Sequence, residues 1–225
     1  MKNALIVGGT SGLGLALAQQ MSSEGVHVMV TGRRSPQIQG ISFRYLSLSP
    51  HANISKSFDE FVATLPHIDF FVYAAGFYQQ GEIQDLQDEH IAEMNMVGLE
   101  APQMLLARIL RKQEDLHWFI SITSTSQWTP RRDEPVYAGS KAGLAHFAHS
   151  VAEGDRVTNV MVVGPAGMAT DFWRDKPGKD MSVMLDPDWV AKQIIDHMGA
   201  CIKYMYIQIL REPARVKIVE GQLQS

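Results

Sequence analysis

The sequence contains a single cysteine, Cys201, among 225 residues. One thiol cannot form an internal disulfide, which argues against a disulfide-stabilised secreted domain and fits a reducing compartment such as the cytoplasm. The sequence also has no apolar stretch near the roughly 20 residues that a membrane-spanning helix needs. The first apolar run, at 4–7, is soon interrupted by glycines, so we interpret it as a strand and not as a signal peptide. A membrane partner is not expected.

Excess charge of either sign is also lacking, because 24 acidic and 20 basic residues give a net charge of -4. No basic stripe suggests a nucleic-acid partner, and no acidic tail suggests a disordered partner arm. The eight histidines show no metal-binding spacing. His146 and His149 lie three residues apart, but no acidic or cysteine partner follows them, so we expect no metal site.

Short apolar runs alternate with amphipathic stretches along the chain, and 45% of the residues are hydrophobic. Strands are expected at 4–7, 26–31, 41–46, 68–75, 117–123, 159–163 and 204–210. Helices are expected at 13–23, 53–65, 88–112, 137–151 and 186–198, the third of them bent or divided by Pro102. This alternation predicts one domain over residues 1–225, with a doubly wound parallel sheet in a three-layer α/β/α Rossmann fold. Segment 171–185 lacks a clear period, and we interpret it as a loop that is either a surface connection or a small substrate lid.

A glycine-rich turn, GGTSGLG, directly follows the first strand and opens the first helix. Gly8, Gly12 and Gly14 lack the side chains that would keep a pyrophosphate away from the backbone. The free N–H groups and the positive dipole at the start of the next helix would then face the phosphates. A plain tight turn is the alternative explanation for the three glycines.

The end of the second strand indicates which dinucleotide is preferred. An acidic side chain there would bind a ribose hydroxyl and repel a 2′-phosphate, but the chain has Gly32 at about this place. Arg33 and Arg34 follow directly, and a guanidinium is suited to binding phosphate. We therefore expect NADP(H) in preference to NAD(H), chiefly through Arg33. The alternative is that both arginines are solvated surface charges.

A tyrosine and a lysine in the pattern YxxxK, Tyr137 and Lys141, follow Ser124 by thirteen residues. Residues four apart share one face of a helix, so the lysine would lie beside the phenol. Its positive charge is expected to lower the pKa of Tyr137 towards the range where a general acid or base works best. The Ser124 hydroxyl would hold a substrate carbonyl beside the phenol.

These motifs together resemble the short-chain dehydrogenase/reductase family from residue 4 to about residue 170. The glycine turn is similar to TGxxxGxG, SITS ends at the serine position, and YAGSK matches the tyrosine and lysine segment. AAG at 74–76 is similar to NNAG, with Tyr73 and Ala74 in place of two asparagines whose hydrogen bonds steady the sheet. Asn95 matches the helix asparagine of the proton relay, and GPAGMAT at 164–170 resembles PGxxxT.

The resemblance implies that NADPH lies over the carboxyl ends of the strands and that hydride passes to a carbonyl, with Tyr137 as proton donor. The catalytic residues implied are Asn95, Ser124, Tyr137 and Lys141. The cofactor-binding residues expected from the motifs and the resemblance are Gly8, Thr10, Ser11, Gly12, Leu13, Gly14, Arg33, Arg34, Ser47, Leu48, Ala74, Ala75, Gly76, Tyr137, Lys141, Pro165, Met168 and Thr170. The C-terminus lacks the glycine-rich ending that often supports tetramers, and a homodimer through the fourth and fifth helices is expected by family analogy.

The substrate itself is not indicated beyond a small carbonyl or alcohol. Arg131 and Arg132 could bind a substrate carboxylate, although we favour ion pairs with their neighbours Asp133 and Glu134. Trp128 is expected on the same loop, and Phe77, Met168 and Trp173 are candidates for either an apolar pocket wall or ordinary packing. A non-catalytic NADP(H)-binding sensor on this fold is the first alternative to an enzyme, and a Rossmann-type methyltransferase, which would leave YxxxK unexplained, is the second.

Overall fold

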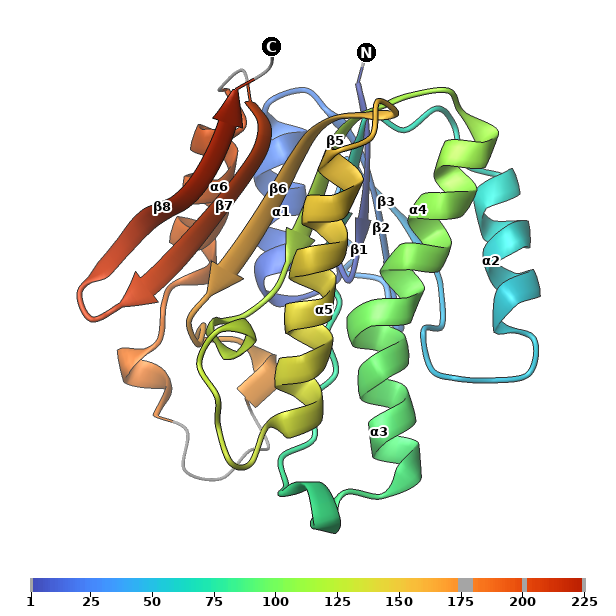
Figure 1. Cartoon of the computed structure of the whole chain (residues 1–225). Coiled ribbons are helices and arrows are strands. Elements are labelled where there is room, and N and C mark those ends of the chain that lie inside the picture. Colours follow the sequence, from blue (N-terminus) through green and yellow to red (C-terminus); the bar gives the residue numbers. More distant parts are fainter. Residues whose placement is uncertain (1, 174–179, 200–201, 224–225) are drawn as a thin grey trace.

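The computed structural model describes residues 2–173, 180–199 and 202–223. A single sheet forms the centre of the molecule, with strands in the order β3-β2-β1-β4-β5-β6-β7-β8 (Figure 1). The strands are β1 (Asn3–Val7), β2 (His27–Gly32), β3 (Ile41–Tyr45), β4 (Phe70–Tyr73), β5 (Leu116–Ile122), β6 (Val157–Pro165), β7 (Ile202–Arg211) and β8 (Ala214–Leu223). All neighbours from β3 across to β7 pair in parallel. The strand order reverses between β1 and β4, the switch point at which doubly wound sheets bind ligands.

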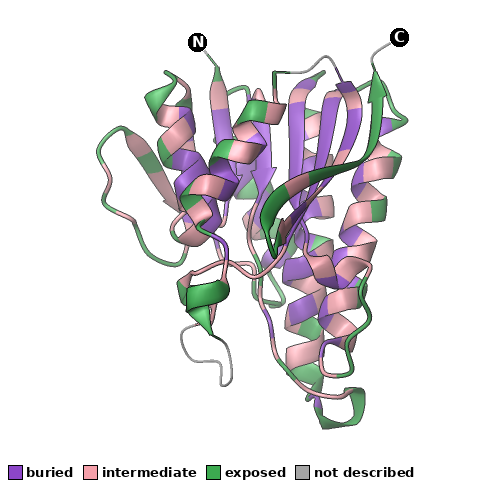
Figure 2. Cartoon of the chain, turned by 90° about the vertical axis from the view of Figure 1, so that its left-hand side faces the viewer, coloured by how far each residue is buried: buried purple, intermediate pink, exposed green. Residues whose placement is uncertain are grey.

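Helices cover both faces of the sheet (Figure 1). They are α1 (Gly12–Ser23), α2 (Ile54–Ala63), α3 (Asp88–Asn95), α4 (Ala101–Lys112), α5 (Pro135–Ala152) and α6 (Pro187–His197). One core cluster joins the sheet to α1 and α6, and another joins its opposite face to α2, α4 and α5. The central strands of the sheet, between these helices, are the most buried part of the chain (Figure 2). The predicted three-layer, doubly wound α/β fold is confirmed.

The long helical region predicted at 88–112 is divided, as the proline suggested. Helix α3 ends at Asn95, a π-helical segment spans Met96–Glu100, and α4 follows with Pro102 in its first turn. Proline lacks the N–H that a helix interior requires, so it is tolerated only near a helix start. The N-terminus of α6 also agrees with the sequence, because Asp186 caps it by accepting a bond from the Asp188 N–H at 2.9 Å.

Strand β8 was not predicted; the sequence indicated β7 as the last strand. It pairs antiparallel with β7 and forms the edge of the sheet. Its residues are almost all exposed and include Lys217, Glu220 and Gly221, so the apolar alternation that reveals a half-buried strand is weak. Edge strands commonly carry such charges and irregularities because these oppose pairing with other chains.

Segment 171–185 contains a short helical turn near each of its ends. A turn of 3-10 helix covers Asp171–Trp173, and a second covers Met181–Val183. Leu185 returns to the loop that follows β6, where its N–H donates to the Gly167 carbonyl at 2.9 Å. Residues 174–179 of the expected lid lie outside the described residues. No described helix is both long and apolar enough to cross a membrane.

Candidate active site

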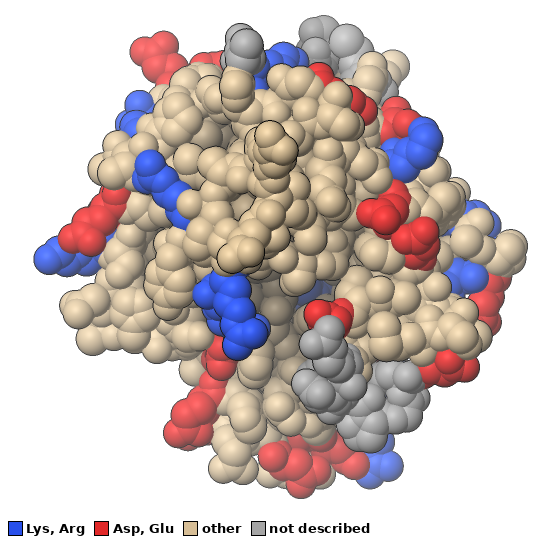
Figure 3. Space-filling model, turned by 180° about the vertical axis from the view of Figure 1, so that it is seen from behind, with Lys and Arg blue, Asp and Glu red and all other residues tan. Residues whose placement is uncertain are grey.

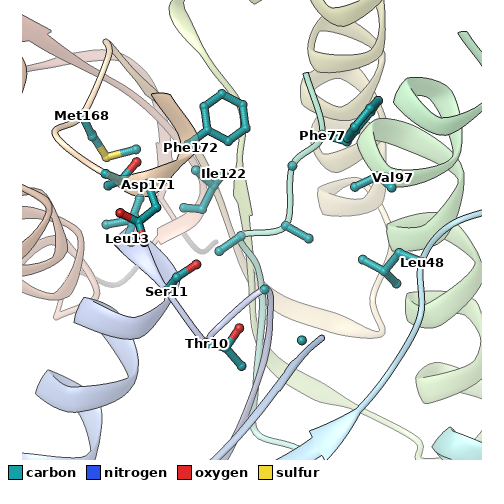
Figure 4. Close-up of a pocket in the computed structure, with 18 of the residues that line it drawn as sticks. Thr10, Ser11, Leu13, Leu48, Phe77, Val97, Ile122, Met168, Asp171 and Phe172 are labelled. Atoms are coloured by element: carbon teal, nitrogen blue, oxygen red, sulfur yellow. The ribbon is translucent and has the colours of Figure 1, made fainter. Parts of the chain in front are cut away.

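A cavity of about 540 Å³ opens at the carboxyl ends of the parallel strands. Loops that follow β1, β2, β3, β4, β5 and β6 all contribute to its wall, together with the first two turns of α5. Figure 4 shows Thr10 and Ser11 of the glycine turn facing Leu48, Val97 and Phe77 across this space. Segments far apart in the sequence therefore meet where ligands bind sheets of this type.

Nearly all of the residues predicted for the site line this one cavity. They are Gly8, Thr10, Ser11, Gly12, Leu13, Gly14, Arg33, Ser47, Leu48, Ala74, Ala75, Gly76, Ser124, Tyr137, Lys141, Pro165, Met168 and Thr170. Two predicted residues are not part of its lining. Asn95 ends α3, and Arg34 follows Arg33 on an exposed loop. Their roles stay predictions.

The glycine turn is packed so closely that side chains are excluded at two of its positions. Gly8 has a φ of 83°, and a Cβ there would lie 2.5 Å from the backbone nitrogen of Ala75. A Cβ at Gly14 would collide with the Gly8 carbonyl oxygen. Ser11 is the N-cap of α1 but makes no side-chain capping bond, and the first turn of the helix contains no acidic residue. The first N–H groups of α1 are thus uncapped by side chains beside the cavity, as phosphate binding requires.

The residue at the end of β2 could not be acidic without rearrangement. A Cβ on Gly32 would collide with the side chain of Thr10. Arg33 is exposed, lines the cavity and forms no ion pair within the described part of the chain. On the face seen in Figure 3, Lys and Arg side chains are interspersed with Asp and Glu. Arg33 is therefore a local cation at the cavity and is available to a phosphate group.

Three of the four predicted catalytic side chains lie together at the carboxyl end of β5. Tyr137 is in the first turn of α5, and its hydroxyl shares a hydrogen bond with Ser124. The Lys141 ammonium lies 5.8 Å from the centroid of the Tyr137 ring and donates to the Ile122 carbonyl at 3.1 Å. Both Tyr137 and Lys141 are buried. A phenol, a hydroxyl and an ammonium thus converge on the space next to the glycine turn.

The expectation that Lys141 lowers the pKa of Tyr137 is wrong for this structure. Burial raises the pKa of Tyr137 to about 12, although the hydrogen bond with Ser124 opposes the shift. Burial also lowers the pKa of Lys141 to about 8, because an ammonium loses its hydration in the same dry site. Desolvation by burial is the largest cause of the pKa shift of each group. Tyr137 consequently holds its proton firmly at neutral pH.

A cluster of aromatic side chains packs around the Tyr137 ring. Tyr78 packs edge-to-face on Tyr137 with ring centroids 5.1 Å apart. Phe172 and Trp173 pack on Tyr78 at 6.1 and 5.6 Å. Phe77, Phe172 and Trp173 line the cavity. The pocket-wall interpretation thus fits Phe77 and Trp173, whereas Tyr78 and Phe172 were missed because isolated aromatic residues give no sequence signal.

A buried carboxylate, Glu134, lies behind the catalytic groups and was not predicted as part of the site. It accepts hydrogen bonds from Ser126 at 2.6 Å and from Arg131 at 2.9 Å. The pairing of Arg131 with Glu134 was the favoured expectation. Arg132 instead pairs with Glu82 at 2.7 Å, so its expected pairing with adjacent acids is wrong. Neither arginine lines the cavity.

The described residues contain no group of three His, Cys, Asp or Glu side chains arranged to hold a metal ion. Trp128 also lies outside the cavity wall. It packs on Tyr206 with ring centroids 6.0 Å apart and covers Gly164, where a Cβ would lie 2.6 Å from the indole. The indole therefore holds the end of β6 in place.

Known proteins resemble this chain over most of its length. The 3-oxoacyl-(acyl-carrier-protein) reductase of Aquifex aeolicus is 28% identical over 190 residues, covering 76% of this chain and 75% of that protein. Elsinochrome reductase 1 of Elsinoe fawcettii is 26% identical over 190 residues, covering 76% of this chain and 70% of that protein. Each is a relative whose name describes a reductase.

Solved structures show the same fold. The structure of BdcA in complex with NADPH superimposes with a TM-score of 0.79 at 22% identity, covering 100% of this chain and 96% of that one. A variant of actinorhodin polyketide ketoreductase with NADPH also gives a TM-score of 0.79, at 18% identity, with coverage of 93% and 96%. The sequence profile of short chain dehydrogenases matches residues 2–180. The chain therefore belongs to the short-chain dehydrogenase/reductase family.

Proposed function

We propose that the protein is an NADP(H)-dependent oxidoreductase that reduces a carbonyl compound or oxidises the corresponding alcohol. One observation carries the proposal. A single cavity is lined by the glycine turn and Arg33, and also by Ser124, Tyr137 and Lys141. A dinucleotide site and a proton donor in one cavity are what hydride transfer to a carbonyl requires.

The residues present fit the cofactor. The close contacts at Gly8 and Gly14 leave bare backbone where a pyrophosphate must approach. Arg33 supports NADP(H) over NAD(H), because its charge complements a 2′-phosphate and Gly32 removes the competing acid. Met168 and Thr170 would hold the carboxamide, and Pro165 lies beside them in the wall. NADPH supplies the hydride when it is bound.

The chain's own groups handle the proton and the negative charge. Tyr137, protonated at neutral pH, donates its proton to the carbonyl oxygen. Ser124 donates a hydrogen bond to the same oxygen and so holds the carbonyl against the phenol. The buried Lys141 ammonium offsets the charge left on the tyrosinate, and Asn95 stays the proposed relay residue behind it. Once the product has left, a proton from solvent must return to Tyr137.

The substrate side of the cavity favours an apolar carbonyl compound. Phe77, Phe172 and Trp173 provide aromatic surface beside Tyr137. Arg131 and Arg132 are engaged by Glu134 and Glu82 and lie outside the lining, which weakens the case for a carboxylate substrate. The names of the two curated relatives describe reductases, which supports the reductive direction.

The test is NADPH oxidation with a panel of apolar aldehydes, ketones and diketones, for the wild type and Tyr137→Phe. We expect turnover by the wild type only, because phenylalanine cannot donate a proton. NADPH should bind both proteins equally in a fluorescence titration. Retained turnover by Tyr137→Phe would remove this residue from the mechanism. A wild type that binds NADPH but reduces no carbonyl would overturn the catalytic proposal in favour of a sensor.

A further inference from the structure

We propose that Glu134 is a positioning residue that, through the Ser126 hydroxyl, fixes the orientation of the Ser124 hydroxyl beside Tyr137. The inference rests on the proposed function. Glu134 is only 5% exposed and Ser126 only 4%. Both lie outside the cavity lining, so they act through Ser124 and not on the substrate.

The Glu134 carboxylate does not make the helix-capping bonds that are usual for an acidic residue at its position. Glu134 is the N-cap of α5, where an acidic side chain usually accepts bonds from the first N–H groups of the helix. It makes no such capping bond. Its oxygen Oε2 accepts from the Ser126 hydroxyl at 2.6 Å and from Nη1 of Arg131 at 2.9 Å, while Oε1 accepts from the Tyr78 hydroxyl at 3.3 Å. The buried Glu134 carboxylate thus faces the residues next to Ser124 and Tyr137.

These bonds determine where the proton of each serine points. Ser126 has one hydroxyl proton, and its short bond to a carboxylate commits that proton to Glu134. Ser126 Oγ therefore presents only lone pairs to its other neighbours, accepting from Nη1 of Arg131 at 2.5 Å and, while no substrate is bound, from the Ser124 hydroxyl at 3.2 Å. The single Ser124 proton must turn from Ser126 to the carbonyl oxygen when a substrate enters. The Ser126 N–H donates back to Ser124 Oγ at 3.1 Å. The N–H bond leaves the Ser124 proton free and so keeps Ser124 Oγ in place while its hydroxyl donates to the carbonyl.

The same carboxylate also supports the phenol from the opposite side. Tyr78 donates to Glu134 and packs edge-to-face on the Tyr137 ring. Glutamate can accept on both oxygens at once, whereas glutamine has one acceptor oxygen and one donor amide. Glu134→Gln therefore cannot keep all three bonds. Either Tyr78 or the pair of Ser126 and Arg131 would face an N–H group instead of an acceptor.

The charges around Tyr137 predict a change in its pKa when Glu134 is neutralised, and a loss of packing alone would not produce this change. Lys141 shares α5 with it, Arg131 and Glu134 approach from the β5–α5 connection, and Tyr78 follows β4. The negative charge of Glu134 raises the pKa of Tyr137 and the positive charge of Arg131 lowers it. Neutralising Glu134 should therefore lower the pH at which the phenol ionises, and Arg131→Gln should raise it.

The experiment compares Glu134→Gln, Ser126→Ala and Ser126→Thr with the wild type. We expect the first two to reduce kcat about tenfold to hundredfold, because slight misplacement of a reacting group has effects of this size. The NADPH dissociation constant should not change. Ser126→Thr keeps the hydroxyl and should restore most of kcat. The double variant Glu134→Gln/Ser126→Ala should lose no more than the worse single variant, because both changes break one chain of bonds.

A second readout does not depend on turnover. In protein labelled with carbon-13 at the tyrosine ζ position, the Tyr137 signal is assigned by its absence from Tyr137→Phe. Its shift towards tyrosinate should begin at lower pH in Glu134→Gln than in the wild type. Glu82→Gln is the matched control, because it breaks the exposed ion pair with Arg132 of the same loop. It should leave both kcat and the titration unchanged.

The outcomes separate this inference from the function on which it rests. A wild type that reduces carbonyls, with Glu134→Gln and Ser126→Ala equally active, would overturn the inference alone. Loss of kcat in Ser126→Thr as large as in Ser126→Ala would also overturn it, because the hydroxyl would then not matter. A wild type without any turnover would overturn both the proposed function and this role for Glu134.

Discussion

The hydroxyl of Tyr73 donates a hydrogen bond of 2.6 Å to the carbonyl oxygen of Val97, and so ties β4 to the π-helical segment between α3 and α4. That carbonyl lacks its usual helical donors. The Ala101 N–H, its α-helical partner, bonds to Met96 instead, and Pro102, the π-helical partner, has no N–H. Tyr73 supplies the missing donor. It thereby links a central strand of the sheet to this segment.

Replacing Tyr73 with phenylalanine should destabilise the fold. The change leaves the buried Val97 carbonyl without a donor, which costs about 1–3 kcal/mol. Urea denaturation measures the free energy of unfolding. Tyr206→Phe is the control, since Tyr206 is only half-buried and its hydroxyl hydrogen-bonds the side chains of Gln208 and Gln127, not a buried backbone carbonyl. Equal stability of Tyr73→Phe and the wild type would show that the hydrogen bond contributes nothing.

Gly14→Ala should damage the dinucleotide site. Its Cβ would collide with the Gly8 carbonyl, so the turn must shift, at about 1–3 kcal/mol of stability. We expect weaker NADPH binding in a fluorescence titration. Gly139→Ala is a matched control in α5, where a Cβ meets nothing within 4 Å. It should raise stability by about 0.5–1 kcal/mol, as for other helical glycines. Unchanged NADPH affinity of Gly14→Ala would argue against the turn as the pyrophosphate site.

Arg33→Gln should change the choice of cofactor. Loss of a charged hydrogen bond, worth about 1.5–3 kcal/mol, should weaken NADPH binding about tenfold to hundredfold and affect NADH little. Arg34→Gln tests the second predicted arginine, and we expect a smaller effect because Arg34 lies outside the cavity lining. Fluorescence titrations of the wild type and both variants with NADPH and with NADH measure the six affinities. A wild type that binds NADH more tightly than NADPH would contradict the role of Arg33.

Stability should depend on pH through Lys141. Burial lowers its pKa to about 8 from about 10.5 in the unfolded chain. Between these values the unfolded state binds more protons than the native state, so this group makes the free energy of unfolding rise with pH. Lys141→Met should lack that rise, which denaturation at pH values from 7 to about 10 would reveal. If the free energy of unfolding changed with pH in the same way for both proteins, burial would not lower the pKa of Lys141.

The glycine turn, Arg33 and the pair of Tyr137 and Lys141 could be predicted because local constraints encode them. A turn packed against backbone requires glycine, and residues four apart on a helix must share a face. Their gathering in one cavity follows from parallel strands that end at one edge of the sheet. The sequence therefore predicted the fold, and nearly all of the residues predicted for the site line one cavity.

The features that sequence reasoning missed depend on contacts between distant segments. Glu134 looks like an ordinary helix-capping acid until its carboxylate is seen to face Ser126 and Tyr78. The predicted direction of the Tyr137 pKa shift was wrong. The YxxxK spacing indicates that a lysine is near the phenol, but it does not indicate that both groups are buried and lose their hydration. The homodimer expected through the fourth and fifth helices stays a prediction that light scattering in solution would test.

Deuterium transfer tests the central claim most directly. NADPH that carries deuterium at the transferred position is incubated with the protein and an apolar ketone, and the product is analysed by mass spectrometry. The wild type should give an alcohol with one deuterium on the former carbonyl carbon, and Tyr137→Phe should give no product. An alcohol without deuterium, or equal product from Tyr137→Phe, would contradict hydride transfer assisted by this phenol.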